Sequence, residues 1–314
     1  MPTIVVSEMI DSIGLEILTT GGEVLYDPTL WQSKENLAMT VADADALVVR
    51  NQTAVTADLL QEWTRLKVVG RLGVGLDNID LDASRQKKIP VVVARGANAV
   101  AVAEYVFAYL FHVCRHLPDV DLSVRNGEWN RSFGGIELHG QTLGLVGLGD
   151  IGQRIAFRAL SFGMHVMAYD PWQLSTHMAV MDMNVILTDL NDVLERSDFV
   201  SVHVPLTPKT RNLMDSHALS RMKRGAYLIN TSRGGIVDED ALLSAIQQGT
   251  LSGAALDVRS QEPSLKTDKL LDESRILLTP HISGLTREAG VRTATTVAQD
   301  VLRVLRGQSP MAAV

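Results

Sequence analysis

The sequence predicts an α/β protein built from two doubly wound parallel sheets. Short apolar runs alternate with amphipathic segments along most of the 314 residues, as in chains that alternate strand and helix. A length of this order is typical of about two domains. A glycine-rich turn near residue 147 separates one such strand from the helix that follows it. Alternation of this kind produces parallel sheets that helices cover on both faces.

The first part of the chain contains its own set of strands and helices. β-Branched runs predict buried strands at 4–6, 46–50, 67–70 and 90–93. Helical spacing of apolar residues predicts helices at 11–20, 33–42, 56–63 and 80–88. These elements form a first α/β domain that lacks a glycine-rich turn of the G-x-G-x-x-G type.

A long apolar helix follows, from Ala99 to about Leu117, and Pro118 is expected to end it. The membrane candidate here is Ala97 to Cys114, but Asn98, Glu104 and His112 interrupt it, so it is too polar and too short to span a bilayer. A polar connector then leads to a second alternating region. Its strands are predicted from 142, at 164–169, near 186, and at 198–202, 226–230, 251–257 and 276–279, before a last helix from about 286 to 306.

The composition narrows the class of protein. A net charge of −7 argues against a general surface for nucleic acid or anionic membrane. The single cysteine, Cys114, excludes an intrachain disulfide and fits a reducing compartment. The N-terminus lacks the basic-then-apolar order of a signal peptide. We therefore expect a cytoplasmic protein with neither a nucleic-acid nor a membrane partner.

The glycine-rich turn has the context of a dinucleotide site. Gly147, Gly149 and Gly152 follow a buried strand and open a helix, where backbone N–H groups and the helix dipole favour a pyrophosphate. The next strand ends in Asp170, 18 positions after the third glycine. A carboxylate there accepts hydrogen bonds from the ribose hydroxyls of NAD and repels the 2′-phosphate of NADP. The sequence thus predicts an NAD-binding Rossmann unit.

Three later segments, each just after a predicted strand, carry polar residues suited to keto-acid chemistry. They contain Arg233, then Asp257 and Glu262, then His281. The carboxyl ends of parallel strands meet at one edge of a sheet, so these segments could line one crevice. A guanidinium binds a carboxylate, an imidazole exchanges a hydroxyl proton, and a carboxylate orients the imidazole. Together with NAD, they predict hydride transfer to or from a 2-keto or 2-hydroxy acid.

These and other motifs resemble those of the NAD-dependent D-2-hydroxyacid dehydrogenase family, and most of all its 3-phosphoglycerate dehydrogenase-like branch. The similarity covers nearly the whole chain. The segments that carry it are 49–53, 68–80, 103–104, 147–152, 203–208, 231–238, 257–263 and 280–281.

The resemblance implies a Rossmann cofactor domain, residues 99–285, inserted into a discontinuous flavodoxin-like substrate domain, residues 1–98 and 286–314. It implies the catalytic residues Arg233, Glu262 and His281, and a homodimer formed through the cofactor domain. The implied NAD-binding residues are Gly147, Gly149, Asp150, Ile151, Gly152, Asp170, His203, Pro205, Thr231, Ser232, Asp257, Ser283 and Gly284. The implied substrate-binding residues are Arg50, Arg71, Leu72, Gly73, Val74 and Asn98.

The expected substrate is 3-phosphoglycerate or 3-phosphohydroxypyruvate. Arg50 and Arg71 each follow a strand, Arg131 lies in the connector, and guanidiniums suit an acid with a second anion at C3. Two departures from the branch stand against this substrate: Ile-Ser-Gly-Leu-Thr follows His281, and the chain ends at Val314 without the regulatory domain of some members. Sulfolactate dehydrogenase and hydroxypyruvate or glyoxylate reductase are the alternatives.

Two other classes of protein compete with this interpretation. His112, Cys114 and His116 lie close in sequence, but on a helix Cys114 points away from the two histidines, so we expect no metal site. The same fold serves some animals as an NAD-sensing transcriptional corepressor without a catalytic role. The full set of Arg233, Glu262 and His281 favours an enzyme over such a sensor.

Overall fold

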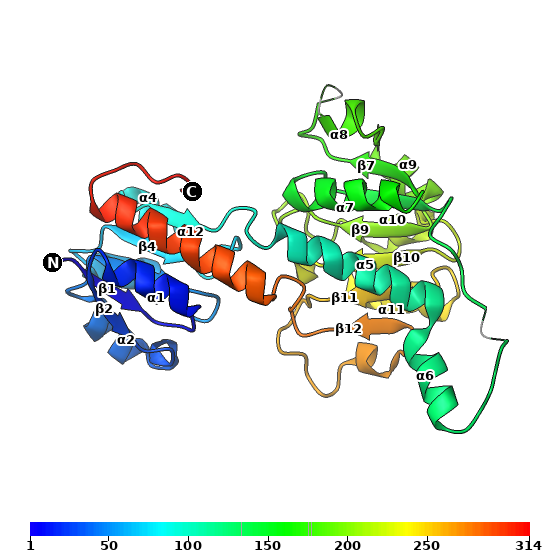
Figure 1. Cartoon of the computed structure of the whole chain (residues 1–314), viewed down its shortest axis with the longest axis horizontal. Helices are drawn as coiled ribbons and strands as arrows, with labels where there is room; N and C mark the ends of the chain where they lie inside the picture. Colours follow the sequence, from blue (N-terminus) through cyan, green and yellow to red (C-terminus); the bar gives the residue numbers. More distant parts are fainter. Residues whose placement is uncertain (133, 175, 177) are drawn as a thin grey trace. The chain divides into compact units, whose positions relative to one another are not determined.

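The chain, seen here as a computed structural model, forms two compact units (Figure 1). The structure describes residues 1–132, 134–174, 176 and 178–314. The N-terminal unit comprises Met1–Asn98 and Leu285–Val314, and the central unit comprises Ala99–Gly284. Each unit has its own parallel sheet.

The N-terminal unit contains a five-stranded parallel sheet in the order β2-β1-β3-β4-β5. Its strands are β1 (Thr3–Val6), β2 (Glu23–Tyr26), β3 (Ala46–Val49), β4 (Val68–Arg71) and β5 (Val91–Val93). The strand order reverses between β1 and β3, which is the flavodoxin-like order. A doubly wound sheet binds ligands at this switch point, where the loops after the two central strands diverge.

Alternating side chains of this sheet build a core on each face. Ile4, Val48 and Val68 pack with Leu18 of one helix and Val301 of another, whereas their sequence neighbours pack against helices on the opposite face. The helices of the unit are α1 (Ser12–Thr19), η1 (Leu30–Gln32), α2 (Lys34–Val41), α3 (Ala57–Glu62), α4 (Leu81–Gln86) and α12 (Arg287–Leu305). Successive side chains of a strand point to opposite faces of the sheet, and helices cover both faces. The strands are therefore continuous apolar runs.

The central unit contains a seven-stranded parallel sheet in the order β12-β11-β10-β9-β6-β7-β8. Its strands are β6 (Thr142–Val146), β7 (His165–Tyr169), β8 (Ile186–Leu187), β9 (Phe199–Val202), β10 (Tyr227–Asn230), β11 (Gly253–Leu256) and β12 (Ile276–Leu278). The order reverses between β6 and β9, so the glycine-rich turn after β6 lies at the switch point of this sheet.

Helices cover both faces of the central sheet (Figure 1). Leu145 and Phe199 pack with Leu110 and Ile155 on one face, and Val200 packs with the helices of the other. The helices are α5 (Ala99–Arg115), α6 (Leu117–Arg125), α7 (Asp150–Ser161), α8 (Met178–Met181), α9 (Leu190–Arg196), α10 (Ser216–Arg221), η2 (Gly234–Ile236), α11 (Glu239–Gln247) and η3 (Lys269–Asp272).

The predicted fold class, an α/β protein with two parallel sheets, is confirmed. Three details of the prediction are wrong. The first long helix ends at Arg115 rather than near Leu117, because His116 adopts a left-handed backbone with φ 48°. A new helix, α6, then begins at Leu117, and Pro118 lies in its first turn, where proline is tolerated. The edge strand β2 was not predicted.

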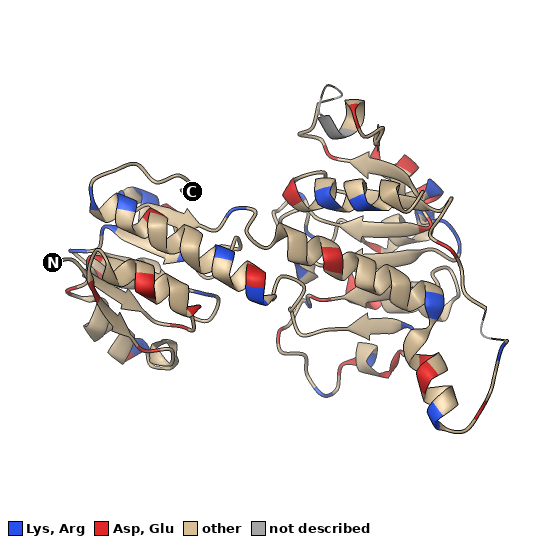
Figure 2. Ribbon diagram, in the orientation of Figure 1, with Lys and Arg blue, Asp and Glu red and all other residues tan. Residues whose placement is uncertain are grey.

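Charged side chains of both signs are interspersed over the ribbons of each unit (Figure 2). Several pair along one helix, as Arg125 does with Asp121 on α6 and Arg154 with Asp150 on α7. Within the described residues, no helix combines the length and apolarity needed to cross a bilayer.

Candidate active site

The turn after β6 leaves room for a ligand beside backbone N–H groups. Gly147 has φ 105°, and a methyl group built on it would lie 2.8 Å from the carbonyl oxygen of His203. A methyl group on Gly152 would lie 2.3 Å from the Gly147 carbonyl oxygen, so this glycine allows the close approach of strand and helix. Built on Gly149, by contrast, it would meet no atom within 4 Å, and no side chain caps α7 at this residue. An uncapped N-terminus with open space fits a pyrophosphate.

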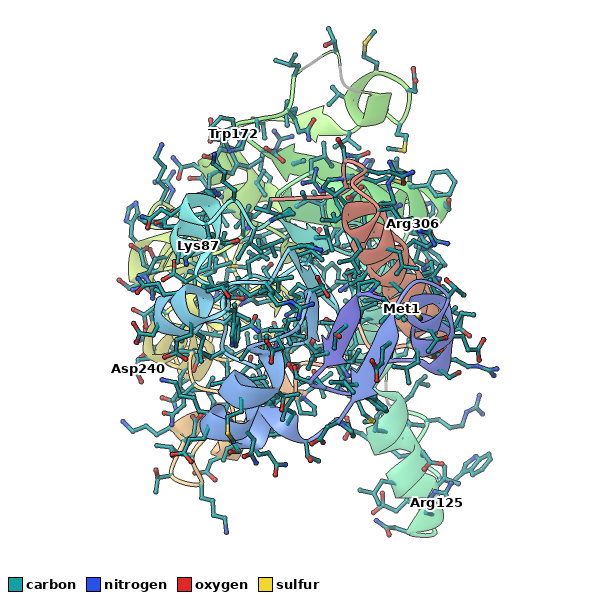
Figure 3. All side chains as sticks on the ribbon, turned by 90° about the vertical axis from the view of Figure 1, so that its left-hand side faces the viewer. Met1, Lys87, Arg125, Trp172, Asp240 and Arg306 are labelled. Carbon is teal, nitrogen blue, oxygen red and sulfur yellow. The ribbon has the colours of Figure 1, made fainter. Side chains whose placement is uncertain are left out.

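Asp170 follows β7 and contacts the same turn. Its Oδ2 accepts a hydrogen bond from the backbone N–H of Leu148 at 2.9 Å, and its Oδ1 accepts one from Trp172 at 2.9 Å. Each oxygen has a further lone pair, so the carboxylate can hold the turn and still accept from a ribose hydroxyl. The Trp172 side chain, labelled in Figure 3, is 86% exposed.

Four neighbouring strands bring the other predicted residues of the central unit to one edge. In the sheet register Asn230 pairs with Val202 and Leu256, and Leu256 pairs with Leu278. The segments that begin at the next residue of each strand therefore leave the same edge of the sheet. They carry His203 and Pro205, then Thr231, Ser232 and Arg233, then Asp257 and Glu262, then His281, Ser283 and Gly284.

Two buried polar atoms at this edge have no protein partner among the described residues. They are Nδ1 of His203 and Oγ1 of Thr231. Buried polar atoms usually have a partner, so their orphan state fits a site that a polar ligand completes. The other ring nitrogen of His203, Nε2, lies 2.8 Å from Oγ of Ser201. Burial lowers the pKa of His203 to about 3, so the imidazole is neutral at physiological pH.

His281 and Glu262 form a direct pair. Nδ1 of His281 lies 2.9 Å from Oε2 of Glu262, and the other carboxylate oxygen, Oε1, accepts a hydrogen bond from the backbone N–H of Arg259 at 2.9 Å. An ionised carboxylate only accepts hydrogen bonds, so this contact keeps a proton on Nδ1. The ring then has Nε2 available for exchange with a reacting group.

The Asp257 carboxylate holds the segment that carries His281. His281 has a left-handed backbone (φ 57°), and its N–H donates to the Asp257 carbonyl oxygen at 2.8 Å. The Asp257 carboxylate accepts hydrogen bonds from Oγ1 of Thr279 and from the backbone N–H groups of Ile282 and Ser283, at 2.6–2.8 Å. Asp257 is only 1% exposed. Its hydrogen bonds stabilise a backbone conformation that a residue with a side chain rarely adopts.

Arg233 lies just after β10, in a turn held by Asn230. The Asn230 side chain donates to the Arg233 carbonyl oxygen at 2.8 Å and accepts from the Ser232 N–H at 3.0 Å. Nη1 of Arg233 donates to the carbonyl oxygen of Ser232 at 2.7 Å. The fully buried Asn230 thereby fixes the start of the Arg233 segment.

The predicted substrate residues Arg50, Arg71, Leu72, Gly73, Val74 and Asn98 all belong to the N-terminal unit. Nη1 of Arg71 donates to the Leu72 carbonyl oxygen at 2.6 Å. The side chain of Leu72 lies in the core, and its backbone N–H donates to the Val49 carbonyl oxygen at 2.8 Å. Gly73 has φ 145°, a backbone conformation that favours glycine, and a methyl group there would also displace the Arg71 guanidinium.

One carboxylate that the sequence did not single out holds the loop of Arg50. Glu8, 3% exposed, accepts hydrogen bonds from four consecutive backbone N–H groups, those of residues 50–53, at 2.7–3.2 Å. On the other side of the loop, Nδ2 of Asn78 donates to the carbonyl oxygens of Arg50 and Thr53. Glu8 follows β1 and the loop follows β3, so the contact fills the switch point of this sheet. The sequence signal that points to Glu8 is an acidic residue two positions after the end of a predicted buried strand.

A second group of charged residues was also not singled out by the sequence. Arg259, Glu239 and Asp268 form a partly buried ion network beside the backbone that contacts Glu262. From the sequence alone, a charged residue in a loop is expected to be a solvated surface group. The partners of Arg259 lie 20 and 9 positions away, so the sequence does not reveal the network.

The described residues contain no group of three or more His, Cys, Asp or Glu side chains close enough to hold a metal ion. Cys114 is buried as a free thiol, and burial raises its pKa to about 11. The ring of His112 stacks on Tyr109.

Comparison with known proteins places the site in a family. Residues 107–283 match the family model described as D-isomer specific 2-hydroxyacid dehydrogenase, NAD binding domain. The chain is 41% identical over 309 residues to a D-3-phosphoglycerate dehydrogenase of Methanocaldococcus jannaschii, covering 98% of this chain and 58% of that protein. It is 42% identical over 288 residues to the Bacillus subtilis D-3-phosphoglycerate dehydrogenase, covering 89% and 54%.

The chain thus spans just over half the length of these curated relatives. Among solved structures, the TT0316 protein of Thermus thermophilus superposes with a TM-score of 0.88 at 34% identity, over 99% of both chains. The family inferred from the sequence motifs is confirmed, and so is the NAD-binding nature of the central unit. The chain belongs to the D-isomer specific 2-hydroxyacid dehydrogenase family.

Proposed function

We propose that the protein is an NAD-dependent D-2-hydroxyacid dehydrogenase. The observation that carries this proposal is the 2.9 Å contact between His281 and Glu262, at the strand edge that also bears the glycine-rich turn. A histidine held by a carboxylate suits proton exchange with a hydroxyl or keto oxygen. NAD(H), when bound, supplies or accepts the hydride.

The residues of the chain then have distinct roles. In the reductive direction, His281 as imidazolium donates the proton on Nε2 to the keto oxygen of the substrate. Glu262 keeps the ring oriented through its contact with Nδ1. Arg233 binds the substrate carboxylate through its guanidinium fork. In the oxidative direction, neutral His281 accepts the hydroxyl proton.

The cofactor site is proposed to comprise the glycine-rich turn and the residues around it. Gly147, Gly149, Asp150, Ile151 and Gly152 would hold the pyrophosphate, and Asp170 the adenosine ribose. The orphan atoms of His203 and Thr231 support their assignment to this site. The remaining proposed residues are Pro205, Ser232, Asp257, Ser283 and Gly284. Asp170 favours NAD over NADP, because a 2′-phosphate would meet a carboxylate.

The substrate we propose is 3-phosphoglycerate in one direction and 3-phosphohydroxypyruvate in the other. Relatives that share 41–42% identity carry the name D-3-phosphoglycerate dehydrogenase. Arg50 directly follows β3 and Arg71 ends the adjacent strand β4 in the N-terminal unit, which we propose as the substrate domain. Two guanidiniums near one sheet edge suit a phosphate at C3. A sulfonate at C3 is the first alternative, and hydroxypyruvate or glyoxylate is the second.

The test is NADH oxidation at 340 nm with phosphohydroxypyruvate, sulfopyruvate, hydroxypyruvate and glyoxylate. Arg50→Ala and Arg71→Ala are measured beside Arg65→Ala, an arginine of the same unit that pairs with Asp45. We expect phosphohydroxypyruvate to be preferred, and the preference to be lost in the first two variants alone. Preference for an uncharged acid would refute the substrate, and absence of turnover on all four would refute the enzyme in favour of an NAD sensor.

We also propose that the protein is a cytoplasmic homodimer that associates through the central unit. The helix α6 has no buried residue, and Leu117, Leu122 and Val124 on it are exposed. Its C-terminal residue, Arg125, lies at the outer end of a helix that projects from the central unit (Figures 1 and 3). Apolar side chains on such a helix suit contact with a second copy. Sedimentation of Leu122→Asp tests this, since the variant should be a monomer.

A further inference from the structure

We propose that Arg259 is a positioning residue, which fixes Glu262 against His281 by joining the segment of Glu262 to the segment of Arg233. The proposal rests on the catalytic roles proposed above. It concerns a residue that touches neither the substrate nor the reacting atoms.

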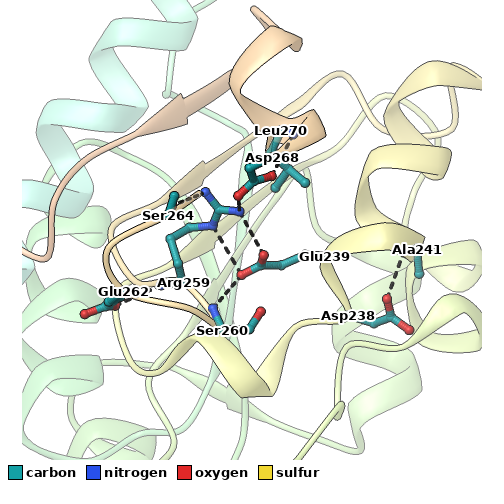
Figure 4. Close-up of polar contacts among 9 residues, drawn as sticks. All are labelled: Asp238, Glu239, Ala241, Arg259, Ser260, Glu262, Ser264, Asp268 and Leu270. Atoms are coloured by element: carbon teal, nitrogen blue, oxygen red, sulfur yellow. Dashed lines mark hydrogen bonds and ion pairs between the residues drawn. The ribbon is translucent and has the colours of Figure 1, made fainter. Parts of the chain in front are cut away.

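The guanidinium of Arg259 is nearly saturated with hydrogen bonds (Figure 4). Nε and Nη2 donate to the two oxygens of Glu239 at 3.2 and 2.9 Å, Nη2 also donates to Asp268 at 2.6 Å, and Nη1 donates to Oγ of Ser264 at 3.0 Å. The side chain is 7% exposed. Burial alone would lower the pKa of Arg259, but the two carboxylates outweigh it and raise that pKa, so the charge is permanent.

The partners of Arg259 tie three stretches of chain together. Glu239 lies in the first turn of α11, which follows the Arg233 segment through η2. Its Oε1 also accepts a hydrogen bond from the backbone N–H of Ser260 at 2.8 Å. Asp268 caps η3 by accepting from the N–H of Leu270 at 3.0 Å. The arginine is therefore bonded to the ends of two other elements and not only to its own loop.

The backbones of the two catalytic segments are in direct contact at this point. A methyl group built on Gly234 would lie 1.9 Å from the carbonyl carbon of Arg259 and 2.2 Å from the nitrogen of Ser260. Gly234 directly follows Arg233. The ion network of Arg259 therefore lies beside the point where the backbone at Gly234 packs against the backbone of Arg259 and Ser260. Together the two contacts fix the orientation of the Arg259 peptide.

This peptide sets the position of Glu262. The N–H of Arg259 donates to Oε1 of Glu262 at 2.9 Å, which leaves Oε2 for Nδ1 of His281. The side chains of Glu262 and His281 are 40% and 45% exposed. An exposed pair is weakly held by its own attraction, because water screens it and both side chains lose rotamer freedom. A rigid, less exposed support behind it compensates for this weakness.

A purely structural role for Arg259 predicts a different result. Removal of a buried ion pair would then lower the stability of the loop and nothing else. If Arg259 positions Glu262, its loss must also change the ionisation of His281. The pH dependence of His281 therefore distinguishes the two roles.

The experiment compares Arg259→Met, Arg259→Lys and Glu239→Gln with Arg275→Met. Arg275 is the matched control, because it pairs with Glu273 through two hydrogen bonds but lies on the surface away from Glu262. The first readout is kcat for NADH oxidation against pH. The second is the NMR titration of the His281 ring proton, which needs no activity. NADH binding and thermal unfolding are measured for every variant.

We expect Arg259→Met to lower kcat about tenfold or more, as displacement of a reacting group does. The NMR titration of the His281 ring proton should differ from that of the parent protein, NADH binding should be unchanged, and Arg275→Met should behave like the parent protein. Arg259→Lys should restore part of the loss. Unchanged kcat and an unchanged titration in Arg259→Met would overturn the proposal. If that variant does not fold, Glu239→Gln, which removes one charge of the network, decides in the same way.

His281→Asn separates this proposal from the catalytic role on which it rests. Full turnover in His281→Asn would refute the proposed function. A loss of turnover there, with no change in Arg259→Met, would refute only the positioning role.

Discussion

Nδ1 of His281 lies 2.9 Å from Oε2 of Glu262, although the two residues are 19 positions apart in the chain. The backbone N–H of His281 donates to the Asp257 carbonyl oxygen, and the carboxylate of Glu262 accepts from the backbone N–H of Arg259. Neither side chain is enclosed. The geometry of the pair therefore depends on the segments that present it.

Replacement of Glu262 by Gln should impair reduction. The amide offers no ionised acceptor to Nδ1 of His281, so the ring is held less firmly toward the keto oxygen. We expect kcat for reduction to fall about 10-fold to 100-fold near neutrality. The measurement is kcat for NADH oxidation, with the exposed Glu137→Gln as control. Parental kcat in Glu262→Gln would mean that this carboxylate does not hold the ring.

Replacement of Arg233 by Lys should reduce kcat/KM although the charge is retained. A lysine offers one compact ammonium group in place of the planar fork that binds a carboxylate through two parallel hydrogen bonds. Loss of one charge-assisted hydrogen bond predicts a decrease of about 10-fold to 100-fold. Steady-state kinetics with the best keto acid measures this, together with the NADH dissociation constant, which should not change. Near-parental turnover would exclude the bidentate role.

The parts of the fold that the sequence predicted are those with a strong local pattern. Buried strands of both sheets, such as Ala46–Val49, are continuous apolar runs. The strand β2 was missed because it lies at the sheet edge with three of its four residues exposed, so it has no such run. The sequence does not predict the helix α6, because this helix buries no residue and because Pro118 indicates the end of a helix, although proline also fits the first turn of one.

The residues of the candidate site that the sequence predicts also lie in recognisable local patterns, whereas the residues that it does not predict have no such pattern. The glycine-rich turn, Asp170 and His281 follow strands in recognisable motifs. Glu8 and Arg259 carry no motif, and their importance lies in partners 42 to 45 and 9 to 20 positions away, respectively. A buried charge is expected only where a partner is available, and partners distant in sequence are not visible before the chain is folded.

Asp170 supports two predictions about cofactor choice, one for each substitution. Asp170→Ala removes the acceptor for the ribose hydroxyls and also the acceptor for the Leu148 N–H. The glycine-rich turn should then be less ordered, so the affinity for both NADH and NADPH should fall. NADH should lose more, by about 10-fold to 100-fold, because a charge-assisted hydrogen bond is lost as well. Asp170→Asn can still accept from Leu148 and should mainly relieve the repulsion of NADPH. Fluorescence titration with both cofactors measures this, and an unchanged preference in both variants would exclude Asp170 from cofactor selection.

Glu8→Gln should destabilise the N-terminal unit and disturb the loop of Arg50. The amide turns an NH₂ group toward backbone donors that previously shared a carboxylate, and each buried donor left unpaired costs about 1–3 kcal/mol. We expect a lower unfolding temperature, and at temperatures where the variant is folded, a raised KM for the C3-anionic acid with little change for glyoxylate. Glu16→Gln on the exposed face of α1 is the control. Equal increases in KM for both acids would separate Glu8 from the anion site.

His203 should make the protein sensitive to mild acid. Its pKa in the folded protein is lowered to about 3 by burial, whereas an unfolded histidine titrates near 6.5. Between these values the unfolded chain binds a proton that the folded chain does not, so the stability supplied by the neutral ring is lost as the pH falls from 6.5 toward 3. At pH 5 the loss amounts to at most about 2 kcal/mol. The thermal unfolding temperature of cofactor-free His203→Asn should therefore fall less between pH 7 and pH 5 than that of the parent or of the exposed control His217→Asn. Identical decreases in all three proteins would mean that other groups, such as the buried carboxylate of Asp45, account for the acid sensitivity.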